Sequence, residues 1–198
     1  AQLMANLSAS TSIHHVTLHV GAGTFKPLVE GDVRNHVMHG ENCSVSFDAI
    51  QALAEDGVHR VATGTTSLRT LESLYWLAIK WKETGEQPFE LNQWEWRNEL
   101  GTKADRLGWS METAMQWCAN ALDGNDWSFR TSVMIIPPYR IRSVRGLITN
   151  FHLPNSTLLC LVASAIGEEW RSVYDRALAE EFRFLSYGDG SYLEWNQR

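Results

Sequence analysis

Residues 147–160, LITNFHLPNSTLLC, decide the fold, because they join two apolar runs through a polar turn. Pro154 fits inside neither a strand nor a helix, and it pushes the residue before it towards extended geometry. We therefore expect a strand that stops at Asn150, a turn at 151–155, and a helix that Asn155 or Ser156 caps. The stretch predicts a strand, a turn and a helix in succession.

The polar side chains of this turn lie at the start of the predicted helix. Thr149, Asn150 and His152 are left where free backbone N–H groups and the helix dipole favour an anionic or polar ligand. These residues therefore indicate a binding site, without identifying its ligand.

Composition bounds the class of protein. With 198 residues, 44% of them hydrophobic, the chain can bury the core of one domain or of a large part of one. A net charge of −6 argues against a protein that coats nucleic acid, although it allows a local basic patch. Three cysteines without a C-x-x-C spacing suit a reducing cytosol and disfavour a disulfide framework or a cysteine-based zinc site. No export or membrane-spanning segment is recognisable, so we expect a cytoplasmic protein with no membrane partner.

Strand and helix patterns alternate along the chain. Apolar–polar alternation predicts a strand at 16–20, and apolar runs predict a strand at 58–64 and two strands within 132–149. Helices are expected at 47–57, 67–83, 110–124 and 168–181. This interleaving indicates an α/β fold in which helices cover both faces of a sheet.

A second turn, in VATGTTSLRTLE at 61–72, also leads from a strand into a helix. Gly64 allows a ligand to approach the backbone, and the hydroxyl groups of Thr65 and Thr66 could hold it. The alternative is a capped helix with a solvent-exposed pair of Arg69 and Glu72. The glycine turn GAGTF at 21–25 is a weaker signal, since a lone G-x-G is common.

Histidines near the start of the chain raise the question of a metal site. His19, His36, His39 and Glu41 could form a ligand set, but their spacing is not H-x-x-x-H on a helix and no Asp or Cys pattern supports it. We therefore favour acid–base or ligand-binding roles, or ordinary polar packing, over zinc binding for these histidines.

Six blocks, in order over residues 16–193, resemble one family. They are VTLHVGAGTF, HVMHGE, GTTSLRTLES, PPYRIR, LITNFHLPNSTLLCLVASAIG and RFLSYGDGSYL. Together they resemble the S-adenosylmethionine:tRNA ribosyltransferase-isomerase family of queuosine biosynthesis.

The resemblance implies a reaction and its substrates. The family moves the ribosyl part of S-adenosylmethionine onto 7-aminomethyl-7-deazaguanine in tRNA, giving epoxyqueuosine and releasing adenine and methionine. S-adenosylmethionine is a substrate there, and the resemblance implies neither a cofactor nor a metal. The competing interpretation is a non-catalytic relative that binds nucleosides or RNA with the same fold.

The resemblance also bears on domain organisation. It implies that residues 1–198 are the C-terminal portion of a catalytic α/β domain, with a mixed sheet between helices in three layers. This domain would be incomplete without an N-terminal segment that carries an inserted β-barrel domain. We therefore expect the 198-residue chain to self-associate. A longer 84–130 stretch and PPY in place of the usual PGY indicate a divergent branch.

The resemblance and the turns together give candidate residues. The candidates for proton transfer are His152, His19, Asp189 and Glu41. The candidates for holding substrate are Gly21, Gly23, Thr24, His36, His39, Gly64, Thr65, Thr66, Arg69, Glu72, Tyr139, Thr149, Asn150, Ser156, Thr157 and Tyr187. A ring of Tyr139 or Tyr187 would face the sulfonium. The candidates for binding RNA are Arg140, Arg142, Arg145 and Arg183.

Overall fold

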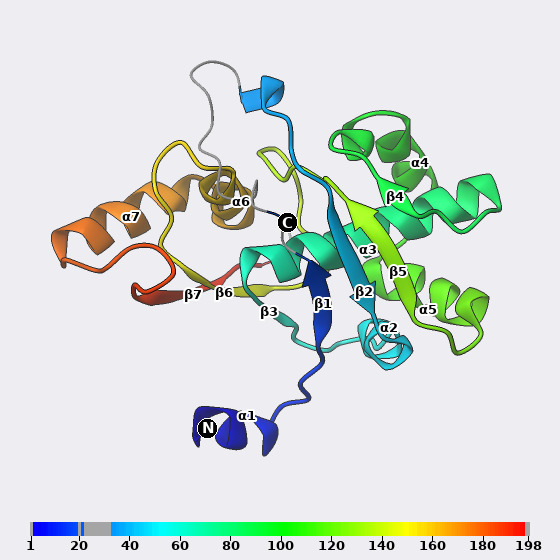
Figure 1. Cartoon of the computed structure of the whole chain (residues 1–198), viewed down its shortest axis with the longest axis horizontal. Helices are drawn as coiled ribbons and strands as arrows, with labels where there is room; N and C mark the ends of the chain where they lie inside the picture. Colours follow the sequence, from blue (N-terminus) through cyan, green and yellow to red (C-terminus); the bar gives the residue numbers. More distant parts are fainter. Residues whose placement is uncertain (1, 20, 22–32, 197–198) are drawn as a thin grey trace.

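A computed structural model describes residues 2–19, 21 and 33–196 of the chain. Its strands form two mixed sheets around a central helix, α3 (Thr65–Thr84) (Figure 1). The α/β class with mixed sheets is therefore confirmed, while the strands are divided between two sheets.

The four-stranded sheet has the order β1-β2-β5-β4. β1 and β2 are antiparallel, as are β2 and β5, whereas β5 and β4 run parallel. The strands are β1 (Val16–His19), β2 (Glu41–Val45), β4 (Glu90–Leu91) and β5 (Trp127–Thr131). Alternate residues of β2 and β5 point to the core, and the residues between them are exposed or half-buried.

The three-stranded sheet has the order β3-β6-β7. β3 and β6 are parallel, and β7 is antiparallel to β6. The strands are β3 (Val61–Thr63), β6 (Gly146–Asn150) and β7 (Gly190–Glu194). Ala62, Leu147 and Leu193 are buried, whereas Val61, Ile148 and Tyr192 are exposed. This outer face is thus open in the described part of the chain, which differs from the expected helices on both faces.

Helix α3 belongs to the cores of both sheets. It contacts β1 and β4 of one sheet and β3 and β6 of the other. Leu68, Leu74, Leu77 and Ile79 are fully buried along it, and burying each such side chain contributes about 2 kcal/mol. Gly85, in the left-handed conformation, ends the helix.

Most of the other described helices pack against α3 or against one another, whereas the first of them is exposed and lies apart from the two sheets (Figure 1). These other helices are α1 (Gln2–Ser8), α2 (Phe47–Leu53), α4 (Glu99–Leu107), α5 (Met111–Leu122), α6 (Thr157–Ile166) and α7 (Trp170–Ala179). The described part of the chain also contains three short 3-10 helices: η1 (Val33–Asn35), η2 (Glu95–Arg97) and η3 (Gly167–Glu169). In the described ranges, no helix is long and apolar enough to cross a membrane.

The expected turn at 151–155 and its helix are confirmed. β6 ends at Asn150, α6 begins at Thr157, and Ser156 caps it by accepting a hydrogen bond from the Leu159 N–H at 3.2 Å. Ser110 caps α5 in the same way, accepting from the Thr113 N–H at 3.2 Å. The serine caps are thus where the sequence predicts them.

One predicted strand is wrong. The run 132–149 contains only β6, because β5 already ends at Thr131. Val133, Met134, Ile135 and Ile136 are buried, but they form no ladder. The Met134 N–H donates instead to the Gln93 carbonyl oxygen. An apolar run that is buried as an irregular segment looks like a strand in the sequence.

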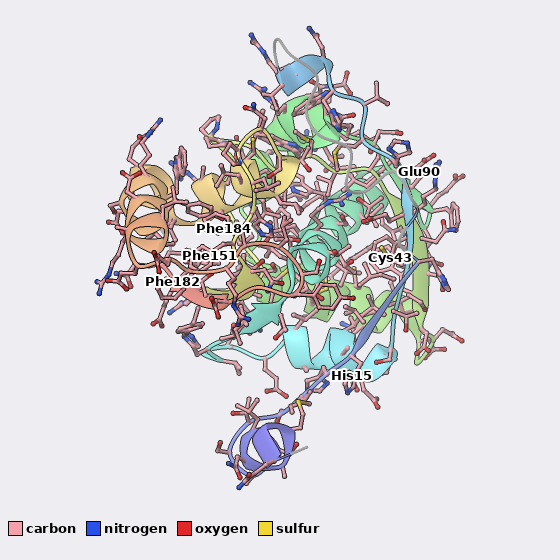
Figure 2. All side chains as sticks on the ribbon, turned by 60° about the vertical axis from the view of Figure 1, so that its left-hand side comes forward. His15, Cys43, Glu90, Phe151, Phe182 and Phe184 are labelled. Carbon is pink, nitrogen blue, oxygen red and sulfur yellow. The ribbon has the colours of Figure 1, made fainter. Side chains whose placement is uncertain are left out.

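A smaller aromatic cluster covers the other side of β6. Phe151 contacts Tyr174 of α7, with ring centroids 5.6 Å apart, and it also contacts Phe182 and Phe184. Figure 2 shows the three phenylalanines close together beside α7. This cluster fixes the chain immediately before His152.

Candidate functional site

The candidate site begins where the two parallel strands β3 and β6 end side by side. Thr63 pairs with Ile148, and the Gly64 N–H donates to the Ile148 carbonyl oxygen at 2.8 Å. Helix α3 follows β3 directly, and the turn before α6 follows β6. In α/β sheets, ligands bind at this carboxyl edge of the strands. The structure therefore brings the Gly64 turn and the His152 turn to one edge.

Gly64 has a backbone that other residues rarely adopt. Its φ of 90° and ψ of 143° lie outside the regions open to residues with a Cβ. Its place as the N-cap of α3 provides no side chain to cap the helix, unlike Ser46, Ser110 and Ser156 on α2, α5 and α6. The first N–H groups of α3 consequently have no side-chain cap.

His152 is held inside the second turn. Only 7% of the residue is exposed. Its Nε2 shares a hydrogen bond of 3.0 Å with Thr149 Oγ1, and its backbone N–H donates to the Tyr174 hydroxyl at 3.1 Å. Burial lowers the pKa of His152 to about 4. The imidazole is therefore neutral at pH 7. In this state it can accept a proton.

The loop 183–189 lies beside this turn. The Leu185 N–H donates to the Phe151 carbonyl oxygen at 2.9 Å. The Arg183 N–H and guanidinium donate to the Asp189 carboxylate at 2.8 and 3.1 Å, which lowers the pKa of that carboxyl group. Asp189 therefore closes the loop as an ionised group, while Tyr187 is 98% exposed.

A buried ion pair lies one turn further along α3. Arg69 donates from Nη1 to Glu41 Oε2 at 2.9 Å and from Nε to the Val133 carbonyl oxygen at 3.2 Å. Arg69 is 4% exposed and Glu41 is 1% exposed. Burial lowers the pKa of the Arg69 guanidinium, and the Glu41 carboxylate opposes that change. The alternative of a solvent-exposed pair between Arg69 and Glu72 is therefore wrong.

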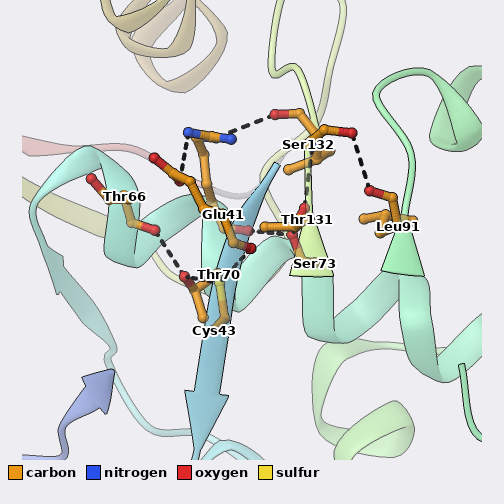
Figure 3. Close-up of polar contacts among 10 residues, drawn as sticks. Glu41, Cys43, Thr66, Thr70, Ser73, Leu91, Thr131 and Ser132 are labelled. Carbon is orange, nitrogen blue, oxygen red and sulfur yellow. Dashed lines mark hydrogen bonds and ion pairs between the residues drawn. The ribbon is translucent and has the colours of Figure 1, made fainter. Parts of the chain in front are cut away.

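Hydroxyl groups extend from this ion pair along the helix. Thr70 donates to the Thr66 carbonyl oxygen at 3.0 Å and contacts Cys43 Sγ at 3.5 Å, and Ser73 shares a hydrogen bond of 2.7 Å with Thr131 (Figure 3). Burial raises the pKa of the Cys43 thiol, so it remains protonated. One face of α3 is thus polar although it is buried.

Glu72 and Tyr139 form a separate network inside the protein. The Glu72 carboxylate accepts from the Tyr139 hydroxyl at 2.6 Å, from the backbone N–H groups of Arg142 and Ser143 at 2.9 and 2.7 Å, and from the Ser143 hydroxyl at 2.5 Å. Arg142 lies 5.9 Å from the centre of the Tyr139 ring. The expected contacts of Glu72 and Tyr139 with substrate stay predictions, and this geometry favours a structural role for both.

Three of the four predicted RNA-binding arginines lie away from the carboxyl-edge residues. Arg140, Arg142 and Arg145 precede β6, whereas Thr149 and His152 are at its far end. Arg140 and Arg145 are exposed. At about 3.3 Å a residue, the two ends of β6 are separated by about 13 Å. Arg183 lies instead near the His152 turn, paired with Asp189.

The remaining candidates lie apart or outside the described residues. His19 and His39 are exposed, and His36 is half-buried with its carbonyl oxygen accepting from Gln93. Within residues 2–19, 21 and 33–196, no group of three or more His, Cys, Asp or Glu residues is arranged to hold a metal ion. Gly21 is described and exposed, whereas Gly23 and Thr24 lie outside the described residues.

Sequence reasoning missed three residues that hold the site together. They are Tyr174, Thr70 and Cys43. Tyr174 lies on an amphipathic helix where an aromatic residue predicts only core packing, and its hydroxyl contact with His152 crosses 22 positions. No local signal identifies such a contact.

The chain can now be compared with known proteins. A family model described as "Queuosine biosynthesis protein" matches residues 1–193, so the chain belongs to that family.

Its relatives are enzymes by name. The chain is 39% identical to the S-adenosylmethionine:tRNA ribosyltransferase-isomerase of Thiobacillus denitrificans, covering 90% of this chain and 40% of that protein. It is 36% identical to the enzyme of the same name from Symbiobacterium thermophilum, covering 98% and 46%. A crystal structure of S-adenosylmethionine tRNA ribosyltransferase from Thermotoga maritima is similar with a TM-score of 0.59 and 26% identity, covering 96% and 48%. The chain thus spans less than half the length of each of these relatives.

Proposed function

We propose that this chain is part of an enzyme that transfers and isomerises the ribosyl moiety of S-adenosylmethionine onto 7-aminomethyl-7-deazaguanine in tRNA. The products would be epoxyqueuosine in tRNA, adenine and methionine. Family membership and the names of the relatives support this proposal. The observation in the structure that carries it is the carboxyl edge of β3 and β6, where these paired strands lead into a helix start without a side-chain cap and into the turn that holds a buried, neutral histidine.

The chemistry needs a group that removes a proton. The positive sulfur of S-adenosylmethionine acidifies the methylene next to it, so a base can take a proton there before adenine leaves. His152 is the candidate for this step because it is neutral at pH 7 and free to accept that proton, although a pKa of about 4 makes it a weaker base than an ordinary histidine. His19, Asp189 and Glu41 stay the other candidates, although Asp189 and Glu41 are held in ion pairs.

Holding S-adenosylmethionine falls to the start of α3 and the turn after β6. Gly64, Thr65, Thr66 and Arg69 would hold the methionine or ribose part, and Thr149 and Asn150 border the same edge. The sulfonium itself activates the substrate, so we propose that the reaction requires no metal or further cofactor.

The acceptor tRNA would bind through the arginines. Arg140 and Arg145 are exposed, and Arg142 lies over the rings of Tyr75 and Trp76 at 5.0 and 4.7 Å. Because Arg145 directly precedes β6, whose two ends are about 13 Å apart, an RNA that reaches His152 would contact Arg145 outside the modified nucleotide. Arg183, beside the His152 turn, would contact the RNA closer to that nucleotide.

Three further features belong to this proposal. Residues 1–198 would be the C-terminal portion of the catalytic α/β domain, the protein would act in the cytoplasm, and the isolated 198-residue chain would self-associate. The open outer face of the β3-β6-β7 sheet supports the last of these.

Adenine release is the reaction-specific test. The chain, alone and joined to the remaining part of the Thermotoga maritima relative, would be incubated with S-adenosylmethionine and tRNA that bears the deazaguanine. We expect adenine release that depends on the tRNA from the joined form and little or none from the chain alone, and His152→Ala should lower the turnover of the joined form by about 100-fold or more with the fold intact. Binding of both substrates with no adenine release in either form would favour the non-catalytic relative.

A further inference from the structure

The guanidinium of Arg69 has one nitrogen that makes no hydrogen bond. Nε and Nη1 are occupied by the Val133 carbonyl oxygen and the Glu41 carboxylate. Nη2 is buried and has no hydrogen-bond partner. A buried donor without a partner is costly, so it requires an explanation.

The contacts of Nε and Nη1 show how the guanidinium of Arg69, and with it Nη2, is held in place. Glu41 comes from β2 and Val133 from the segment after β5, so the planar guanidinium is fixed by two elements outside its own helix. Glu41 also balances the charge of Arg69. Arg69 is therefore a rigid donor whose remaining N–H groups suit a second oxyanion.

The start of α3 supports the same ligand chemistry independently. This 20-residue helix has Gly64 as its N-cap and no side-chain cap. Arg69 follows Thr65 by one turn of the helix, and long side chains on a helix generally lean towards its N-terminus, which would turn the guanidinium towards that start. Free N–H groups at a helix start and the positive end of the dipole favour an anion.

We infer that Arg69 Nη2 and the start of α3 bind the α-carboxylate of S-adenosylmethionine. This inference rests on the proposed function and assigns one end of that substrate. The carboxylate is the only anionic group of the molecule, and its planar shape matches the guanidinium. A phosphate of the acceptor RNA has related chemistry, but Arg69 is only 4% exposed and sits between two elements, which favours a small ligand. Placing the carboxylate here directs the sulfonium and ribose away from the ion pair.

Removing the carboxylate from the ligand tests the inference without changing the protein. Binding of S-adenosylmethionine and of its decarboxylated form would be measured by calorimetry on the same chain. We expect the decarboxylated form to bind about 10- to 100-fold more weakly, the range for a charge-assisted hydrogen bond lost from a closed site.

The variant that isolates Arg69 keeps the buried charges balanced. Arg69→Met alone would leave the Glu41 carboxylate buried without its cation, so Arg69→Met is combined with Glu41→Gln. The double variant should bind the two ligands with equal affinity. Arg60→Met with Glu112→Gln is the matched control, because Arg60 also pairs with a glutamate at 2.7 Å and also has a buried nitrogen, Nε, without a partner. The control should keep the full preference for S-adenosylmethionine.

Each outcome decides between the two proposals. Equal binding of both ligands by the unchanged chain would overturn the carboxylate assignment and leave the proposed function standing. Loss of tRNA affinity in the Arg69 double variant, with the ligand preference intact, would assign Arg69 to an RNA phosphate and also overturn it. Absence of binding to either ligand would count against the proposed function itself.

Discussion

His152 is buried and its side chain makes a single hydrogen bond, to Thr149. Its pKa therefore differs between the folded and the unfolded protein. With a pKa of about 4 in the folded protein and about 6.5 in the unfolded chain, the unfolded chain binds more protons between these two values. The contribution of His152 to the free energy of unfolding is therefore fully present above pH 6.5 and is lost as the pH falls towards 4.

The first prediction concerns this dependence on pH. The free energy of unfolding should fall between pH 6.5 and 4, with His152 contributing up to about 1.4 kcal/mol per pH unit. His152→Gln should remove that contribution, whereas His14→Gln, at an exposed position, should not. Urea denaturation at a series of pH values measures how the free energy of unfolding depends on pH in each variant. An identical slope in the His152 variant would mean that the imidazole is not shielded as described.

At the residue scale, the sequence predicts the position of His152 but not its environment. The strand, proline and serine cap are local signals, and they place the histidine at a turn. Its neutrality depends on burial in the folded protein, where Tyr174 reaches the turn only after α7 folds back. For the same reason, the sequence identifies Arg69 and Glu41 as candidates but cannot pair them.

Among the elements, α3 holds the segment 139–143 through one side chain. The Glu72 carboxylate accepts four hydrogen bonds from Tyr139, Arg142 and Ser143, and Glu72 is fully buried. This carboxylate holds the irregular segment 139–143, which forms no hydrogen bonds of a β-sheet, in place. It also explains why the apolar run beside it need not be a strand.

The second prediction follows from that network. Glu72→Gln replaces one accepting oxygen by an N–H₂ group and should lower the free energy of unfolding by about 2–4 kcal/mol, because donors would then face donors. Urea denaturation measures the loss. Glu83→Gln on the same helix, which breaks a pair with the exposed Arg106, should lower the free energy of unfolding much less, because an exposed ion pair is screened by water. Equal losses in the two variants would show that the network adds nothing beyond a surface pair.

Helices were easier to predict than strands in this chain. Serine caps and apolar residues at helical spacing are local, and the structure confirms α3, α5, α6 and α7. A strand is defined by its partners, and β4 and β7 pair with segments 40 and more positions away. β4 has only two residues, which are too few for an alternating apolar–polar pattern to be recognised in the sequence.

For the whole molecule, the open face of the β3-β6-β7 sheet is the feature with the widest effect. Val61, Ile148 and Tyr192 are 39%, 43% and 52% exposed, one on each strand. Ile148 and Tyr192 are direct partners across the sheet. Adjacent apolar side chains on a flat face favour association with another surface.

The third prediction is that the isolated chain self-associates through this face. Sedimentation velocity should show a mean mass that rises with protein concentration, and Ile148→Lys should shift the chain towards monomer. Phe89→Lys, at a position that is 63% exposed at the other sheet, is the matched control and should change nothing. A monomer at all concentrations, with or without Ile148→Lys, would contradict the prediction.

The position of α3 between the two sheets also determines how the molecule comes apart. Neither sheet keeps its own core when this helix is lost, because Leu68, Leu74 and Ile79 are fully buried in the common cluster. Two sheets that would otherwise be separate cooperative units are therefore coupled into one. Opening of the helix therefore requires global unfolding. The elements that carry the candidate site thus share the stability of the most protected part of the protein.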